Sequence, residues 1–362
     1  MSGVKTHSWI DDLNVYVSGS SKVVGAQKAV KLSANESALG PSPMAIAAYK
    51  AAAENLHRYP DPVYHDLREA IGEKFNLDAK RIVCGVGSDE ILKLACRAYL
   101  KPGDEAIYVA HSFSMYPIAI KSVGAVAIEV CDVDYRADVD NIIAAITDKT
   151  RIIFIANPNN PTGTYLPATE IERLWQNIPD TILLILDAAY AEFVDADDYE
   201  AGIELASKAN NVLMTRTFSK LYGLAALRLG WGYACKKIAH TLDKIRDPFN
   251  VPSSAQVAGV AALKDLDFEQ KAISHNSQWR EWLSNELSAL GLRIIPSVTN
   301  FILIKFENKN KTAADANEFL LKNGYILRYY NEQGLEDCLR LTVGTADENN
   351  ELIGLLKEFL EK

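Results

Sequence analysis

Lys220 is the residue whose type and position could do the most chemistry in this sequence of 362 residues. It ends the segment 215–220, which follows an apolar run at 212–214 that is typical of a buried strand. A lysine amine at a strand end can form an imine with an aldehyde. A single lysine is more often a solvated surface charge, so this interpretation depends on other residues that could serve the same chemistry.

Asp187 is the second candidate, because it ends the apolar run 182–186. Open α/β sheets bind ligands at the carboxyl ends of their strands. A carboxylate buried there needs a cationic partner, such as a protonated ring nitrogen. A helix cap or a metal ligand is the competing interpretation of Asp187 taken alone. Tyr190 follows three residues later and could reach the same ligand.

Two loops add polar groups that suit a small phosphorylated ligand. The segment 157–163 carries two prolines and a glycine, which predicts a turn or a rigid loop that holds the amide of Asn160 in place. The segment 85–90, Gly-Val-Gly-Ser-Asp-Glu, leads into an expected helix, and a helix N-terminus binds phosphate. Because the third glycine of a dinucleotide-binding loop is missing, we expect a single phosphate, with Arg228 as a second anchor.

The elements that must position these residues alternate between strands and helices. Apolar runs of four to eight residues are typical of strands covered on both faces, and such alternation predicts an α/β fold with a mainly parallel sheet. The expected strands are 105–110, 125–130, 151–156 and 182–186, and the helices include 88–99 and 168–178.

The last third of the chain predicts a smaller α+β domain. Its expected helices are 277–290, 313–323 and 348–360, and its expected strands are 293–295, 300–306, 325–330 and 338–343. Two prolines at 247–253 mark a boundary. We therefore predict an N-terminal arm with part of the small domain at 1–34, a large domain at 35–250 and a small domain at 251–362.

The composition argues against several classes of protein. A net charge of −9 disfavours nucleic acid and anionic membranes as partners. Five scattered cysteines without CxxC spacing predict neither structural zinc nor a disulfide framework, and a reducing cytoplasm fits them. No apolar run approaches the roughly 20 residues that cross a bilayer, and no secretory signal is visible. We therefore expect a cytoplasmic protein with no metal and no membrane contact.

The residues together resemble the fold-type I pyridoxal 5'-phosphate (PLP) aminotransferases, and within them the histidinol-phosphate aminotransferases. The resemblance runs in order from about residue 31 to the C-terminus. Its motifs are Lys31–Glu36, Arg58–Asp61, Gly87–Glu90, Asn160–Gly163, Asp187–Tyr190, Arg216–Leu224 and Leu339–Gly344. It implies a large PLP-binding domain, a smaller α+β domain and a homodimer with shared active sites.

The resemblance also implies a role for each matching residue on the cofactor. Lys220 would hold PLP as an imine and act as the base, and Asp187 would pair with the pyridine nitrogen. The ring would be stacked by Phe113, and its oxygen would be contacted by Asn160 and Tyr190. The phosphate would be surrounded by Ser88, Asp89, Ser219, Arg228 and, from the partner subunit, the residue equivalent to Tyr59.

The substrate end of the resemblance is less uniform. Arg340 would bind the anionic end of the substrate, with Arg328 as a phosphate partner and with Tyr16, Asn160 and Tyr59 nearby. The segment 15–20, Val-Tyr-Val-Ser-Gly-Ser, departs from the family's Pro-Tyr-x-Pro-Gly-Lys. Asp-Ala-Ala-Tyr stands at 187–190 for the usual Asp-Glu-Ala-Tyr, and Phe113 for the usual tyrosine.

The implied reaction is a step of histidine biosynthesis. An amino group would pass between glutamate and 2-oxoglutarate on one side and histidinol phosphate and imidazole-acetol phosphate on the other. Three alternatives stay open: an aminotransferase for phenylalanine and tyrosine, alone or with both activities; a PLP decarboxylase of threonine phosphate; and a binding protein that kept the fold without catalysis.

Overall fold

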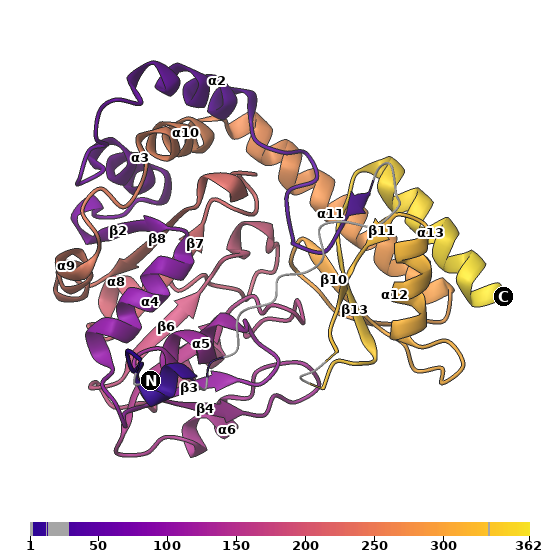
Figure 1. Cartoon of the computed structure of the whole chain (residues 1–362), viewed down its shortest axis with the longest axis horizontal. Helices are drawn as coiled ribbons and strands as arrows, with labels where there is room; N and C mark the ends of the chain where they lie inside the picture. The colour runs from indigo at the N-terminus through magenta and orange to yellow at the C-terminus, as the bar shows by residue number, and fades with distance from the viewer. Residues whose placement is uncertain (1–2, 12, 14–28, 332–333) are drawn as a thin grey trace.

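The computed structural model describes residues 3–11, 13, 29–331 and 334–362, so Tyr16 lies outside the described residues. The described chain forms a large domain around a seven-stranded sheet and a small domain around a four-stranded sheet. The long helix α11 (Leu266–Ala289) runs from one domain to the other (Figure 1).

The large sheet has the strand order β2-β8-β7-β6-β5-β3-β4. β8 is antiparallel to β2 and β7 on its two sides, and all other neighbouring strands are parallel, so the prediction of a mainly parallel sheet is confirmed. In chain order the strands are β2 (Ile82–Val86), β3 (Glu105–Val109), β4 (Val126–Val130), β5 (Thr150–Ala156), β6 (Leu183–Asp187), β7 (Val212–Thr217) and β8 (Leu229–Ala234).

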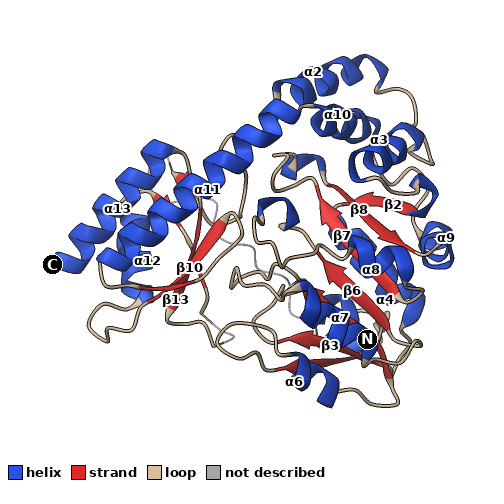
Figure 2. Cartoon of the chain, turned by 180° about the vertical axis from the view of Figure 1, so that it is seen from behind, coloured by secondary structure: helices blue, strands red, loops and turns tan. Residues whose placement is uncertain are grey.

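Helices cover both faces of this sheet, as Figure 2 shows. One face packs on α4 (Ser88–Tyr99), α5 (Met115–Lys121) and α9 (Lys236–Ile245). The other packs on α2 (Pro43–Ala52), α3 (His65–Phe75), α6 (Val139–Ala144), α7 (Ala168–Gln176), α8 (Ile203–Lys208) and α10 (Ser253–Lys264).

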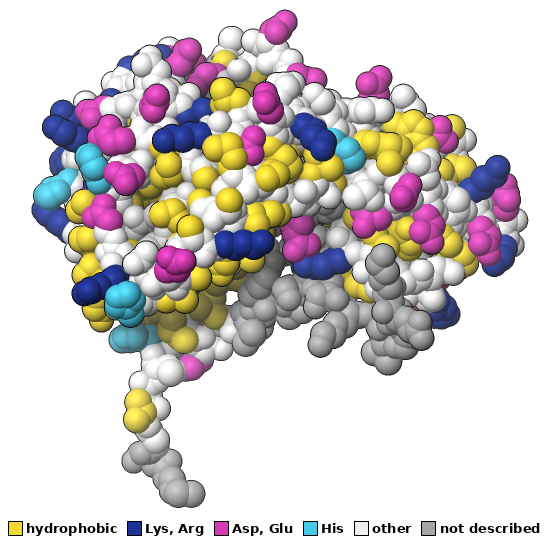
Figure 3. All heavy atoms as spheres, turned by 90° about the horizontal axis from the view of Figure 1, so that it is seen from above, with side chains coloured by type: hydrophobic (Ala, Val, Ile, Leu, Met, Phe, Trp, Pro, Cys, Tyr) yellow, Lys and Arg dark blue, Asp and Glu magenta, His cyan; other side chains and the backbone are white. Residues whose placement is uncertain are grey.

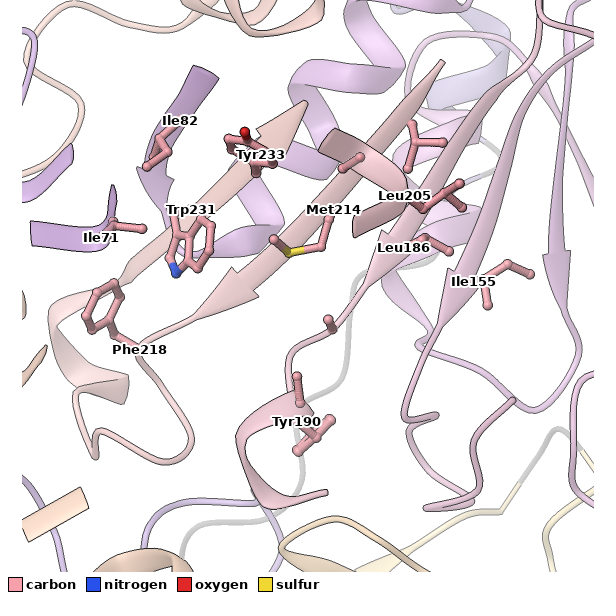
Figure 4. Packing of buried hydrophobic residues seen from close by; sticks show 14 of the residues in the cluster. Ile71, Ile82, Ile155, Leu186, Tyr190, Leu205, Met214, Phe218, Trp231 and Tyr233 are labelled. Atoms are coloured by element: carbon pink, nitrogen blue, oxygen red, sulfur yellow. The ribbon is translucent and has the colours of Figure 1, made fainter. Parts of the chain in front are cut away.

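The apolar runs of the sequence fill these two layers because side chains alternate along a strand. In β5, Ile153 and Ile155 face the α2–α3 side, while Ile152 and Phe154 face the α4–α5 side. Figure 4 shows the packing on the side of α2 and α3, where Met214 of β7 lies near Trp231 of the neighbouring strand β8. Burial of each such side chain stabilises the fold by about 1.5–3 kcal/mol.

The small domain has the strand order β12-β13-β10-β9 and packs on α11, α12 and α13. A separate pair, β1 with β11, ties the residues after the N-terminal segment to this domain. The elements are β1 (Val30–Lys31), β9 (Arg293–Ile295), β10 (Phe301–Lys305), α12 (Ala313–Lys322), β11 (Tyr325–Ile326), β12 (Arg328–Tyr329), β13 (Cys338–Thr342) and α13 (Ala346–Glu361).

Short elements complete the description. They are α1 (Ser8–Asp11), η1 (Ala53–Asn55), η2 (Ala79–Arg81), η3 (Ala191–Phe193) and η4 (Ala225–Leu227).

Two expected elements of the small domain were wrong in extent. The helix expected at 277–290 is the end of α11, which begins at Leu266 because the side chain of Asp265 caps its N-terminus. The strand expected at 325–330 is divided at Leu327 into β11 and β12, because these pair with strands of two different sheets. The predicted domain boundary stays a prediction; α10, which it assigns to the small domain, packs on α2 and α3.

Candidate active site

A cavity of about 540 Å³ opens at the carboxyl ends of β6 and β7, beside the segment 33–36 and the strands β12 and β13. Most of the residues predicted from the sequence line this one cavity. They are Ser88, Asp89, Phe113, Asn160, Asp187, Tyr190, Ser219, Lys220, Arg228, Arg328 and Arg340.

Lys220 reaches the cavity from the loop that follows β7. Its Nζ donates a hydrogen bond to the backbone oxygen of Ala34 at 3.3 Å and lies 5.6 Å from the centre of the Tyr190 ring. Burial, followed by the positive charge of Arg340, lowers the pKa of the Lys220 amine to about 8. The lowered pKa raises the share of this amine that is uncharged near neutral pH, and the uncharged amine is the form that attacks an aldehyde.

Asp187 is the last residue of β6, and its side chain is 5% exposed. The parallel register places it directly beside Thr215 of β7. Its carboxylate accepts hydrogen bonds from the Tyr116 hydroxyl at 2.9 Å and from the Thr215 hydroxyl at 3.3 Å. Burial raises the pKa of this carboxyl to about 6, against the hydrogen bonds from Tyr116, Thr215 and the backbone of Ala189, which favour the charged form.

Tyr190 lies on the wall of the cavity next to Asn35. Its hydroxyl accepts a hydrogen bond from the Asn35 side chain at 2.8 Å, and burial raises its pKa to about 12. Asn35 has a left-handed backbone conformation with φ of 55°, and its backbone N–H donates to the Thr342 hydroxyl at 3.0 Å. The two hydrogen bonds of Asn35 thus join the segment before α2 both to β13, through Thr342, and to the large domain, through Tyr190.

The segment 85–90 forms a cradle of donors at one end of the cavity. Gly87 has φ of 78°, and a Cβ there would lie 2.5 Å from the Arg228 Nη2 atom. A Cβ on Gly230 would lie 2.2 Å from the backbone nitrogen of Ser88, the first residue of α4. Arg228 also contacts the Ser219 hydroxyl at 3.4 Å. Both glycines are needed here, because a side chain would fill the space next to the donors.

Asp89 is an acidic side chain of this cradle that contacts Arg228. Its carboxylate accepts a hydrogen bond from the Arg228 Nη2 atom at 3.3 Å. The ion pair orients the guanidinium toward the start of α4.

Arg340 occupies the other end of the cavity and is 7% exposed. Its Nη1 donates to the Asn160 side-chain oxygen, and its Nη2 donates to the backbone oxygen of Ser33 at 2.7 Å. Its buried Nε has no hydrogen-bond partner among the described residues. Arg340 lies directly opposite Arg328 on the neighbouring strand, and both guanidinium groups lie within 6.0 Å of the centre of the Tyr330 ring.

The loop 157–163 presents Asn160 to this end. Its other two asparagines point into the protein: Asn157 bonds the backbone of Leu166 at 2.8 and 3.0 Å, and Asn159 donates to the backbone oxygen of His111 at 2.6 Å. Both Asn–Pro peptide bonds of the loop are cis.

Tyr59 does not line the cavity of its own chain. It is 82% exposed and stacks on Phe249 with 4.6 Å between the ring centres. Tyr16, the remaining predicted residue, lies outside the described residues.

The cavity or near-cavity residues that the sequence reasoning missed include Asn35, Tyr116, Thr215 and Tyr330. Thr215 could have been found from the sequence, since it directly follows the apolar run 212–214, which predicts a buried strand. The side chain of Tyr116 comes from a helix that no motif marks, so the sequence held no comparable signal for it.

Neither a metal-binding group nor a membrane-spanning helix was found in the described part of the chain. No three histidine, cysteine or acidic side chains there are grouped so that they could hold a metal ion. None of its helices is both long and apolar enough to cross a membrane.

Comparison with known proteins gives a consistent answer. The model of the family described as aminotransferase class I and II matches residues 27–356. The histidinol-phosphate aminotransferases of Paramagnetospirillum magneticum and Maricaulis maris are 51% and 49% identical, over 97% and 99% of both chains. A crystal structure of histidinol-phosphate aminotransferase from Sinorhizobium meliloti in complex with pyridoxal-5'-phosphate superposes with a TM-score of 0.92 at 27% identity, covering 99% of this chain and 98% of the other. The predicted fold class is confirmed.

Proposed function

Because the chain belongs to the class I and II aminotransferase family, we propose that it uses PLP to move an amino group between glutamate and imidazole-acetol phosphate. The products are 2-oxoglutarate and histidinol phosphate, and the reaction runs in both directions. The observation that carries this proposal is a pair of buried charges in one cavity, the Asp187 carboxylate and the Arg340 guanidinium. The hydrogen-bond partners described above for both charges are neutral, so each can pair with an opposite charge on a bound molecule.

The residues at the first end fit PLP. The cradle of segment 85–90, together with Ser219 and Arg228, offers N–H and O–H donors. The absence of side chains on Gly87 and Gly230 keeps space next to these donors, which suits a phosphate. Asp187 offers a carboxylate for the ring nitrogen, and Lys220 offers an amine for the aldehyde. Phe113, beside Tyr116, offers a ring face.

When bound, PLP supplies an aldehyde that takes up an amino group and a protonated ring that withdraws electrons. The chain then has three tasks. Asp187 keeps the ring nitrogen protonated, because its negative charge raises the pKa of that nitrogen. Once the amine of the substrate has displaced it from the aldehyde carbon, the Lys220 Nζ takes the proton from the amine-bearing carbon of the substrate, and its lowered pKa favours the uncharged form that this step needs. Tyr190 and Asn160 orient the ring oxygen.

The residues at the second end fit an anionic substrate. Arg340 presents a fork of donors that matches a carboxylate or phosphate, and its unpartnered Nε leaves a further donor. Arg328 lies directly opposite on β12. Two adjacent guanidinium groups repel each other, so a doubly charged phosphate between or beside them is favoured. This arrangement supports histidinol phosphate over an uncharged aromatic side chain.

We further propose a homodimer in which Tyr59 serves the partner's site. Apolar side chains are exposed along α2 and α10, on the face that Figure 3 shows from above, where yellow surface gathers at the centre. They include Met44 and Tyr49 of α2 and Val257 of α10, and the stacked rings of Tyr59 and Phe249 are exposed as well. A second copy covering these residues would remove apolar surface from water. The mass in solution, measured by light scattering, tests this.

A cytoplasmic location is also proposed. All five cysteines are free in the structure, and Cys84, Cys96 and Cys338 are buried as thiols. A reducing compartment suits such a protein.

A substrate panel with purified protein and PLP tests the main proposal. We expect kcat/KM for histidinol phosphate to exceed that for phenylalanine by at least about tenfold, since the two arginines discriminate by a charge-assisted contact. A tenfold preference for phenylalanine would show that the proposed substrate is wrong and that the chain is an aminotransferase for aromatic amino acids. Release of carbon dioxide from threonine phosphate without formation of a keto acid would show that the chain is a decarboxylase and not an aminotransferase.

A further inference from the structure

Tyr116 is a fully buried residue that no motif marks and that the chemistry described so far does not use. It lies in the first turn of α5, and its side chain is 0% exposed. Its hydroxyl donates the shorter of the two side-chain hydrogen bonds to the Asp187 carboxylate, at 2.9 Å against 3.3 Å for Thr215. The hydroxyl of Tyr116 thus makes the shortest side-chain hydrogen bond to the buried acid.

The ring of Tyr116 is fixed on two sides. It stacks on Phe154 of β5 with 4.9 Å between ring centres and 20° between the planes. It also meets Phe113 edge to face, with 5.6 Å between centres and 90° between planes. Such pairs contribute beyond the area they bury and hold the hydroxyl in one direction. Tyr116 therefore contacts both Phe113, which would stack on the face of a bound ring, and Asp187, which would pair with its nitrogen.

We propose that Tyr116 is a positioning residue for the reaction: its hydroxyl orients the Asp187 carboxylate toward the ring nitrogen of PLP and keeps it ionised, and its ring supports Phe113. This inference rests on the proposed function. A phenol suits the task because it donates to the carboxylate without carrying a positive charge. A lysine or arginine here would neutralise Asp187 and compete with the protonated ring for it.

The surroundings also keep the phenol in its donor form. Burial, followed by the negative charge of Asp187, raises the pKa of Tyr116 well above its ordinary value. The other ionisable groups that act on this pair are Asp89 and Tyr190, neither of which hydrogen-bonds to the carboxylate. The phenol of Tyr116 therefore keeps its proton, and with it its donor role, at neutral pH.

Tyr116→Phe tests the proposal, because it removes the hydroxyl and keeps both ring contacts. We expect the dissociation constant of PLP to rise, and kcat to fall by about tenfold or more, since a hydrogen bond to a charged group is lost. KM for glutamate should change by less than about threefold, because the hydroxyl touches no substrate. Tyr108→Phe is the matched control: Tyr108 also donates to a carboxylate, that of Glu129 at 2.7 Å, and lies outside the cavity.

The decisive measurement is the effect of Tyr116→Phe on PLP affinity when the Asp187 carboxylate or the ring nitrogen that it pairs with has been removed. In an Asp187→Asn background, or with a PLP analogue that carries carbon in place of the ring nitrogen, Tyr116→Phe should no longer weaken binding of the cofactor. An equal loss in both backgrounds would show a merely structural role and overturn the proposal. So would wild-type PLP affinity and kcat in Tyr116→Phe.

Failure of the proposed function gives a different result. If the wild-type protein does not bind PLP, the function itself is wrong. If wild type binds PLP and Tyr116→Phe matches it, only this inference fails. Should Tyr116→Phe not fold, the double variant with Asp187→Asn, which has no buried carboxylate to lose its donor, should fold. If the double variant does not fold either, the hydroxyl is needed for folding independently of the carboxylate, and the proposal is wrong.

Discussion

The two ends of the cavity solve the same electrostatic problem in different ways. At one end Asp187 is a buried anion whose partners, Tyr116 and Thr215, are neutral donors from the sheet and a helix packed on it. At the other end Arg340 is a buried cation whose partners, Asn160 and Ser33, are neutral acceptors. Each charge would be costly if nothing bound to it, and each is oriented by hydrogen bonds that do not cancel it.

The difference lies in where the partners come from. Asp187 and Thr215 sit in register on adjacent strands of one sheet, so the core of the large domain sets their geometry. Arg340 lies in the small sheet, Asn160 in a loop of the large domain and Ser33 in the segment before α2. The first end is thus fixed by one rigid core, whereas the second is assembled from three separate segments. We therefore expect changes at the first end to affect the chemical step and changes at the second to affect the choice of substrate.

The largest effect is expected at the residue between the two ends. Lys220→Ala should lower kcat by at least about 10³-fold, because both the covalent link and the base are lost. Single-turnover kinetics with histidinol phosphate, together with the absorbance of the bound cofactor, measure this. Lys220→Arg is the control, since it keeps the positive charge but forms no imine and should be equally inactive. Turnover within tenfold of wild type in either variant would contradict the assignment.

Asp187→Asn should have opposite effects on activity and on the stability of the cofactor-free protein. We expect kcat to fall by about 10²–10³-fold, because the charge that stabilises the transition state is lost. Without cofactor, the folded-state pKa of about 6 lies above the ordinary value of 3.8, so the charged carboxylate opposes folding at neutral pH. The variant should then be more stable than wild type by up to about 3 kcal/mol.

The pH dependence of that stability difference follows from the same pKa values. As pH rises from 3.8 to about 6, the cofactor-free wild type loses stability relative to Asp187→Asn, and above about 6 the difference is constant. Urea unfolding of both proteins at pH 5 and pH 7.5 measures this. A difference that is absent, or that shrinks as pH rises, would contradict a buried charge at Asp187.

Arg340→Gln should change binding at the second end. We expect KM for glutamate and for histidinol phosphate to rise by about 10–100-fold, as expected for loss of a charge-assisted contact. Arg328→Gln is the matched variant on the opposite strand and should raise KM for histidinol phosphate only. Steady-state kinetics with both substrates distinguish them. If Arg340→Gln lowered kcat and left both KM values unchanged, the contrast between the two ends would be wrong.

The smallest effect is expected at the glycines of the cradle. Gly87→Ala should destabilise the fold by about 1 kcal/mol, because its φ is positive, and should weaken PLP binding about tenfold, because the new Cβ would displace the Arg228 guanidinium. Gly103→Ala is the control, since Gly103 also has a positive φ but has no atom within 4 Å of such a Cβ. Equal PLP affinity in the two variants would mean that the cradle does not hold the phosphate.

The sequence by itself determined much of the first end. The apolar runs before Asp187 and Lys220 predicted strands that are buried on both faces, and strand ends of a parallel sheet meet at one edge because all strands point the same way. The glycines of segment 85–90 indicated a close approach of the backbone, and Gly87 does adopt a positive φ. These are local signals, so they can be read without knowledge of the rest of the fold.

Only the tertiary structure decided the contacts between segments that lie far apart in the chain. Tyr116 meets Asp187 across 71 residues, and Arg340 meets Ser33 across 307. Neither contact follows from local periodicity, because periodicity gives the face on which a side chain lies and not the partner on the other element. The division of residues 325–330 between two sheets has the same cause. Thus the sequence predicted which groups could do the chemistry, and packing of distant segments decided how their charges are oriented.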